Sequence, residues 1–171
     1  IGGVPYYLTQ VKKGKSATQV IDQLCFQKNA LLYDEFNKLF SSLFEDADYY
    51  KELIRVIAKK RSGLSLTEIE QNCPGLSSGG TLTTKLKDLE DAAFIKSFMP
   101  LGHKRQGKYF KVIDEYCYFY LQWIEPIKNE LSLDYSENQQ WMNIAGTAKY
   151  YSWQGYAFEL VCYKHLNLIR K

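Results

Sequence analysis

The order of local signals between residues 65 and 114 constrains the fold more than any other feature of the chain. The motif Asn72-Cys73-Pro74-Gly75 separates two short helical segments, because proline cannot continue a helix and glycine allows the backbone angles of a turn. Two segments rich in aromatic and branched residues follow, at 94–99 and 108–113, with a loop containing glycine and proline between them. Helix, turn, helix, strand, loop and strand in this order are typical of a winged helix-turn-helix.

Both helices of this segment have sequence signatures. Ser65-Leu66-Thr67-Glu68 predicts a capping box, in which Ser65 accepts from the Glu68 amide and the Glu68 carboxylate reaches back to the Ser65 amide. The second helix is expected to begin near Ser78 and to serve as the recognition helix. Its three- and four-residue spacing predicts a buried stripe of Leu82, Leu86, Leu89 and Ala93. The same periodicity places Thr81, Thr84, Lys85, Asp88 and Asp91 outside.

The loop between the two strands is basic. Residues 103–108 carry His103 and three full positive charges, Lys104, Arg105 and Lys108, without an acid. Such a loop suits a phosphate backbone, because cations bound there release condensed counterions. Hairpin loops are also commonly basic for solubility alone, so this second interpretation stays open.

The composition of the recognition helix does not favour strong recognition of a particular DNA base sequence. The recognition helix carries two lysines, Lys85 and Lys87, and three acidic residues, so its outer face is near neutral or slightly acidic. An acidic face repels a polyanion such as DNA. Threonine hydroxyls could meet base edges, but no Arg or Gln is offered. A wing that faces a protein or is purely structural is therefore weighed as well. The predicted DNA-binding residues are Thr81, Thr83, Thr84, Lys85, Lys87, His103, Lys104, Arg105 and Lys108.

Composition sets outer bounds. The chain has 171 residues, 46% of them hydrophobic, and a formal charge of +3, which predicts a globular protein and names no partner. Four widely spaced cysteines support neither a zinc site nor a disulfide framework, so free thiols are expected. No apolar run approaches the roughly 20 residues that span a bilayer, so no membrane partner and a cytoplasmic location are expected.

Helices are expected on both sides of the winged segment, which gives a mainly α fold with a small β wing. The aromatic run at 114–124 is interpreted as a core helix, with base stacking or contact with another domain as alternatives. A last helix is expected after Trp153-Gln154-Gly155, with Ala157, Phe158, Val161, Cys162 and Leu166 inward. The chain opens without methionine and closes without a helix cap, so we expect a fragment of a longer protein.

Several motifs together resemble a known family. These are Gly2-Gly3-Val4-Pro5-Tyr6-Tyr7-Leu8, Glu35 within a helix, residues 50–58, the segment 109–114 with Phe119-Tyr120, and Gly155-Tyr156-Ala157-Phe158-Glu159. In this order the chain resembles the C-terminal half of the archaeal-type AAA+ ATPases of prokaryotes. The resemblance implies a helical lid remnant at 1–45, a winged helix at 49–125 and the start of a restriction-endonuclease-like domain at 131–171.

The departures from that family define what this fragment lacks. No G-x-x-x-x-G-K-[ST] motif is present, because Gly79-Gly80-Thr81 has no lysine, so no enzymatic activity and no cofactor are expected here. The resemblance implies ATP and Mg²⁺ for the full-length parent. It also matches Glu159 to a glutamate that helps to hold a divalent metal in the nuclease-like domain. Because the other ligands would lie beyond Lys171, neither a metal site nor a catalytic residue is expected.

Two functional hypotheses result. In the first, the face formed by residues 81–87 meets the major groove of double-stranded DNA while Lys104, Arg105 and Lys108 contact phosphates. In the second, the winged helix is a protein-interaction or relay domain. It would pack on the ATPase core of the same chain or on a partner protein, without DNA binding. The mark of the second would be an exposed apolar patch around residues 116–123.

Overall fold

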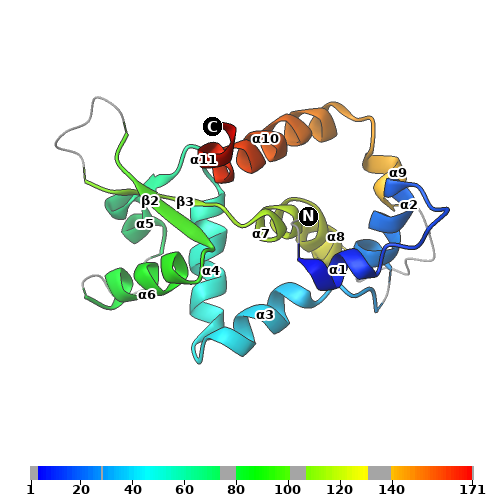
Figure 1. The fold of residues 1–171 in the computed structure, drawn as a ribbon. Coiled ribbons are helices and arrows are strands. Elements are labelled where there is room, and N and C mark those ends of the chain that lie inside the picture. The colour runs from blue at the N-terminus through cyan, green and yellow to red at the C-terminus, as the bar shows by residue number, and fades with distance from the viewer. Residues whose placement is uncertain (1–3, 28, 74–79, 101–106, 131–139, 171) are drawn as a thin grey trace. The chain divides into compact units, whose positions relative to one another are not determined.

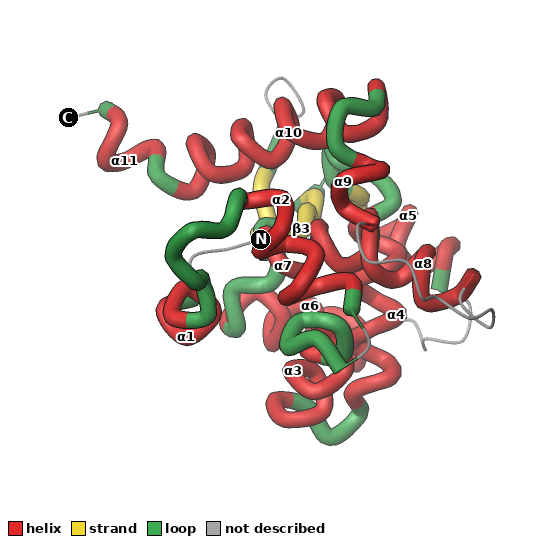
Figure 2. The backbone as a smooth tube through the Cα atoms, turned by 90° about the vertical axis from the view of Figure 1, so that its right-hand side faces the viewer, coloured by secondary structure: helices red, strands yellow, loops and turns green. Residues whose placement is uncertain are grey.

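The structure, a computed structural model, describes residues 4–27, 29–73, 80–100, 107–130 and 140–170. Helix prevails among them, and strand is confined to one small sheet (Figure 2). The predicted fold class, mainly α with a small β wing, is confirmed. The chain forms two compact units, one of Asn37–Leu121 and one of Ile1–Phe36 with Gln122–Lys171. The predicted segments 1–45, 49–125 and 131–171 stay predictions.

The unit Asn37–Leu121 contains the winged segment. Most of α3 lies before the winged segment in this unit, and α7 follows the segment. The strands are short: β2 and β3 pair with each other, and β1 is added at the edge beside β3. Its elements are α3 (Glu35–Leu43), α4 (Ala47–Ala58), β1 (Leu64–Ser65), α5 (Leu66–Asn72), α6 (Gly80–Asp91), β2 (Ile95–Phe98), β3 (Tyr109–Val112) and α7 (Glu115–Phe119). The predicted start of the second helix near Ser78 lies outside the described residues, and α6 is described from Gly80 onward.

The three strands form an antiparallel sheet in the order β1-β3-β2. Phe110 of β3 lies opposite Leu64 on one side and Ser97 on the other. Figure 1 shows α4, α5 and α6 gathered around this sheet, with α4 against β3 and α6 against β2. The core between them includes the predicted leucines of α6 and the inward strand residues: Leu82, Leu86, Leu89, Ile95, Phe110 and Val112 are all buried.

The start of α5 is the predicted capping box. The Ser65 hydroxyl accepts from the Glu68 amide at 3.3 Å, and the Glu68 carboxylate accepts from the Ser65 amide at 2.8 Å. Lys60 Nζ also donates to this carboxylate at 2.8 Å. The bond from Lys60, followed by those from Ser65, lowers the pKa of Glu68 from its usual 4.5 to about 2.

Because the pKa of Glu68 is lowered, the stability of the unit Asn37–Leu121 depends on pH in the acidic range. The contribution of the Glu68 carboxylate is complete above pH 4.5 and is lost as the pH falls toward 2, because protonation removes the negative charge that the Lys60 and Ser65 donors stabilise. We expect Glu68→Gln, whose amide oxygen keeps an acceptor but does not titrate, to lose less stability between pH 7 and pH 3 than the wild type does. Urea denaturation at the two pH values measures this, with Glu70→Gln on the same helix as the control. An equal loss in the wild type and in Glu68→Gln would contradict the assignment.

The end of α6 differs from its prediction. Ala93 was expected in the buried stripe, but it is exposed and has a left-handed φ of 60°. The helix ends at Asp91, and the Phe94 amide donates to the Leu89 carbonyl at 2.9 Å, which closes the turn. Phe94 therefore enters the core in place of Ala93, with its ring centroid 4.8 Å from that of Phe40.

The other unit is helical and is organised around tryptophan. The rings of Trp123, Trp141 and Trp153 meet edge to face with centroids 5.6 to 6.0 Å apart, and a carboxylate oxygen of the buried Asp22 accepts from the Trp141 amide at 2.6 Å. Its helical elements are α1 (Pro5–Thr9), α2 (Ala17–Ile21), η1 (Asp22–Phe26), η2 (Tyr120–Ile124), α8 (Glu125–Glu130), α9 (Gln140–Ile144), α10 (Ala148–Lys164) and α11 (Leu166–Ile169).

The last long helix was predicted with the wrong start, and two of its five predicted inward residues are exposed, whereas Ala157, Cys162 and Leu166 are half-buried. α10 begins at Ala148 and runs through Gly155. Phe158 and Val161, expected inward, are 70% and 44% exposed, while Leu160 is buried. The reason is the tryptophan cluster, because the contacts of Trp153 fix which side of α10 faces the core.

All four cysteines are free thiols, as predicted. Cys25, Cys73 and Cys117 are buried, and burial raises the pKa of the Cys25 thiol from 9.0 to about 12. A thiol in this state is a poor nucleophile and contributes through packing. No described helix is long and apolar enough to cross a membrane.

Candidate nucleic-acid interface

The outer face of α6 begins with hydroxyl groups. Thr81, Thr83 and Thr84 are exposed, and they alternate around the buried Leu82. The Thr84 hydroxyl donates to the Gly80 carbonyl at 2.9 Å, as threonines within helices often do. The first turns of α6 therefore present small donors and acceptors at the surface.

Lys85 does not lie on this outer face, which corrects the prediction. Its side chain is only 12% exposed, and its ammonium is 2.9 Å from the Asp46 carboxylate. The same nitrogen is 4.6 and 4.5 Å from the ring centroids of Tyr49 and Tyr50, where cation and aromatic face attract each other. Lys85 thus joins α6 to α4 and the residues just before it.

Two acids of α6 are likewise engaged on the inner side. Asp88, expected outside, is half-buried and accepts from the Tyr50 hydroxyl at 2.6 Å. Burial and this bond to Asp88 raise the pKa of Tyr50. Glu90 accepts from the backbone amide and the hydroxyl of Ser97, both at 2.8 Å. These contacts tie α6 to α4 and to β2.

The remaining charges of α6 form an exposed pair. Lys87 and Asp91, one helical turn apart, make an ion pair that raises the pKa of Lys87. Because Asp88 and Glu90 are occupied within the unit, the exposed acid of α6 is Asp91, and Lys87 lies beside it. The outer face of the helix is therefore close to neutral.

The wing has a basic and aromatic outer face. Lys96 of β2 lies directly opposite Lys111 of β3, and Phe98 lies opposite Tyr109. Successive strand residues point to opposite faces, so these two pairs share the face away from the buried Phe110 and Val112. This face of the wing therefore carries two lysines side by side with two aromatic rings.

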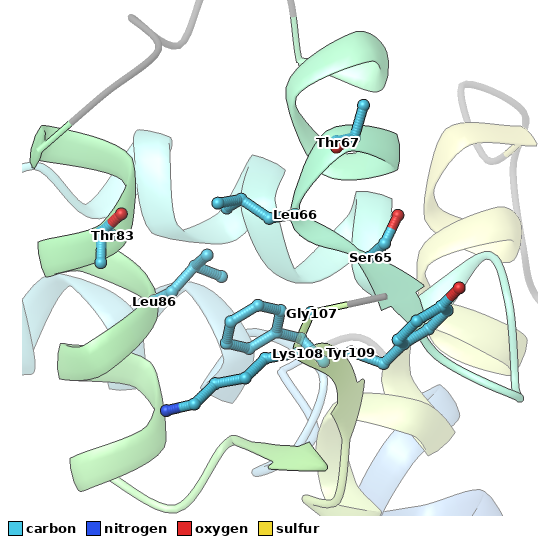
Figure 3. Close-up of a pocket in the computed structure, with 9 residues that line it drawn as sticks. Ser65, Leu66, Thr67, Thr83, Leu86, Gly107, Lys108 and Tyr109 are labelled. Carbon is cyan, nitrogen blue, oxygen red and sulfur yellow. The ribbon is translucent and has the colours of Figure 1, made fainter. Parts of the chain in front are cut away.

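A groove separates α6 from the wing. It has a volume of about 700 Å³ and is lined by residues of β1, α5, α6, β3 and the segment that enters β3: Ser65, Leu66, Thr67, Thr83, Leu86, Gly107, Lys108, Tyr109 and Phe110. Figure 3 shows the Lys108 side chain reaching from the start of β3 toward α6, which carries Thr83. Lys108, Thr67 and Thr83 are exposed, whereas Leu86 and Phe110 are buried beneath them.

The structure thus brings together part of the predicted set. Thr83 and Lys108 share the groove, Thr81, Thr84 and Lys87 lie on the exposed surface of α6, and Lys85 is turned inward. His103, Lys104 and Arg105 lie outside the described residues.

Sequence reasoning missed four residues at this surface. Thr67 and Tyr109 line the groove, and Lys96 and Lys111 form the opposed pair of the wing. The lysine pair could have been found by aligning the two strands about their loop, since alternation places residues at matching positions on one face. Thr67 gave no such signal, because its position depends on how α5 packs.

Glu159, which the family resemblance matched to a metal-binding glutamate, is an exposed residue of α10. Among the residues that the structure describes, no three His, Cys, Asp or Glu side chains are grouped so that they could hold a metal ion.

The elements α4, β1, α5, α6, β2 and β3 follow one another in this order, and β3 lies between β1 and β2 in the sheet. No family model, curated protein or solved structure matches this chain.

Proposed function

We propose that the winged helix binds double-stranded DNA, with α6 toward the major groove and the wing cations on the phosphates. One observation carries this proposal. Residues 92–113 contain five Lys or Arg side chains and no acid. Within this range β2 and β3 pair as antiparallel strands, and Lys108 lines the groove beside α6. Such local concentration of cations is the electrostatic footprint of a nucleic-acid binder. The five are Lys96, Lys104, Arg105, Lys108 and Lys111.

The acidic side chains of α6 are bonded to other side chains or backbone groups of the same unit, and this supports the proposal. An acidic recognition helix would repel DNA, but Asp88 is bonded to Tyr50 and Glu90 to Ser97. The exposed Asp91 is paired with Lys87. What α6 offers to a ligand is therefore mainly hydroxyl groups rather than negative charge.

The width of the major groove of the nucleic acid favours duplex DNA over duplex RNA as the ligand. An α-helix with its side chains is about 10 to 12 Å across, and the major groove of B-DNA is about 12 Å wide. The major groove of A-form RNA is deep and too narrow for side chains to read. A helix that projects beside a basic wing thus fits duplex DNA.

The test is fluorescence anisotropy of a labelled random-sequence DNA duplex titrated with this chain. If three phosphates are neutralised, we expect the affinity to fall about fortyfold between 0.05 and 0.2 M salt. A duplex RNA of the same length is the control and should bind more weakly. Absence of binding at 0.05 M salt, or an affinity that ignores salt, would refute the proposal.

The second candidate function is the protein-interaction or relay domain. Its expected mark is not found, because Tyr116, Cys117, Tyr118, Phe119, Tyr120 and Trp123 are all buried. A different observation favours a protein partner for the other compact unit, because side chains of α10 and α11 in that unit are apolar and exposed: Tyr151, Phe158, Val161, Leu168 and Ile169. In the AAA+ parent that the resemblance implies, the ATPase core is the partner under this hypothesis. A negative DNA titration would favour it.

A further inference from the structure

We infer that DNA binding by this module is independent of base sequence, because the contacts are made to phosphates in the groove between α6 and the wing. The inference rests on the proposed DNA binding and adds which part of the DNA is recognised. It follows from two features of the described residues: what the recognition helix lacks, and what the groove contains.

The recognition helix lacks the side chains that read bases. Bases are distinguished in the major groove mainly through paired hydrogen bonds from Arg, Asn or Gln, and α6 contains none of these. Of its two lysines, Lys85 is held by Asp46 and the two tyrosine rings, and Lys87 is paired with Asp91. Threonine hydroxyls remain, and a hydroxyl both donates and accepts, so it fits several bases equally well.

The groove contains the side chains that bind phosphates. Thr67 from α5, Thr83 from α6 and Lys108 from the wing come from three elements and line one depression. Their hydroxyl and ammonium groups are donors of the kind that protein–DNA complexes direct at phosphate oxygens. Leu86 and Phe110 beneath them are buried, so they support the groove without reaching a base edge. Phosphate contacts fix the position of the protein but carry no sequence information.

The experiment uses a pool of DNA duplexes with a randomised central segment. The pool is passed once over the immobilised chain at 0.1 M salt, and the retained and input fractions are sequenced. A specific reader prefers its site by 10³-fold or more over other DNA, so its motif would be enriched strongly. We expect retention of the pool with no short motif enriched more than about twofold.

A pair of variants tests the groove. Lys108→Gln should weaken binding to every duplex by about eightfold at 0.1 M salt and reduce the salt slope by about one, which corresponds to one phosphate contact. Lys38→Gln, which removes one exposed charge from α3, is the matched control and should leave the affinity unchanged. Circular dichroism of both variants checks that the fold is kept.

Each outcome decides a separate question. A motif enriched more than about twofold would overturn sequence independence while leaving DNA binding intact. An affinity that Lys108→Gln does not change would overturn the groove as the phosphate site. Failure to retain any duplex would instead refute the proposed function itself.

Discussion

Reversing three charges of the wing loop, Lys104→Glu, Arg105→Glu and Lys108→Glu together, is expected to lower the affinity for duplex DNA about 500-fold at 0.1 M salt. One phosphate contact is worth about eightfold at this salt concentration, and three independent contacts multiply. The slope of log affinity against log salt should become shallower by about 2.7, since each lost contact contributes about 0.9. Fluorescence anisotropy over a series of salt concentrations measures both quantities.

The control has to separate position from net charge. Lys12, Lys13 and Lys15 are exposed lysines within four residues, and changing all three to Glu takes the formal charge from +3 to −3. The wing variant undergoes the same change of charge, because each substitution replaces +1 by −1. We expect the control to retain most of the affinity. Equal losses in both variants would mean that overall charge, rather than the wing, holds the DNA.

The largest expected effect on stability is that of Gly63→Ala, in the turn that precedes β1. Gly63 has φ of 89°, and its amide donates to the Lys60 carbonyl at 2.9 Å in the turn that leads from α4 into β1. An added Cβ would lie 2.9 Å from the Phe110 carbonyl oxygen and 3.0 Å from a ring carbon of Phe98. The first of these atoms belongs to the backbone of β3, so the strand itself would have to move.

Two costs add in this substitution. A left-handed conformation costs a residue with a Cβ about 1 to 2 kcal/mol. Displacing β3 from β1 adds to it, so we expect the free energy of unfolding to fall by about 3 kcal/mol, which is large for a single substitution. Urea denaturation followed by far-UV circular dichroism measures the loss. Tryptophan fluorescence is unsuitable, because all three tryptophans belong to the other compact unit.

Gly107→Ala is the matched control for the steric part. Gly107 belongs to the same unit and has φ of 65°, but no atom of the residues that the structure describes lies within 4 Å of its added Cβ. We expect a loss of about 1 kcal/mol there, from backbone conformation alone. If the two substitutions were equally destabilising, the close approach of Gly63 to β3 would have no energetic role.

Local interactions explain why much of the winged segment is predictable from sequence. The capping box joins Ser65 and Glu68, three residues apart, and the stripe Leu82, Leu86 and Leu89 depends only on helical periodicity. The two wing strands adjoin one loop, so their pairing involves residues close in the chain. The cations of the wing can be counted from sequence directly, but their number does not reveal that Lys96 faces Lys111.

Tertiary structure decided which side chains of the candidate interface are available. Lys85 and Asp88 look like surface residues from periodicity, yet their partners Asp46 and Tyr50 lie 39 and 38 residues away. The face of α10 was likewise set by distant tryptophans rather than by its own spacing, and the groove exists because α5, α6 and β3 meet. The sequence by itself thus determined the elements and the positive charge of the wing, because hydrogen bonds and periodicities within a few residues specify them. Only the packing of distant segments determined which charged groups remain outside, because a side chain leaves water where a remote partner compensates it.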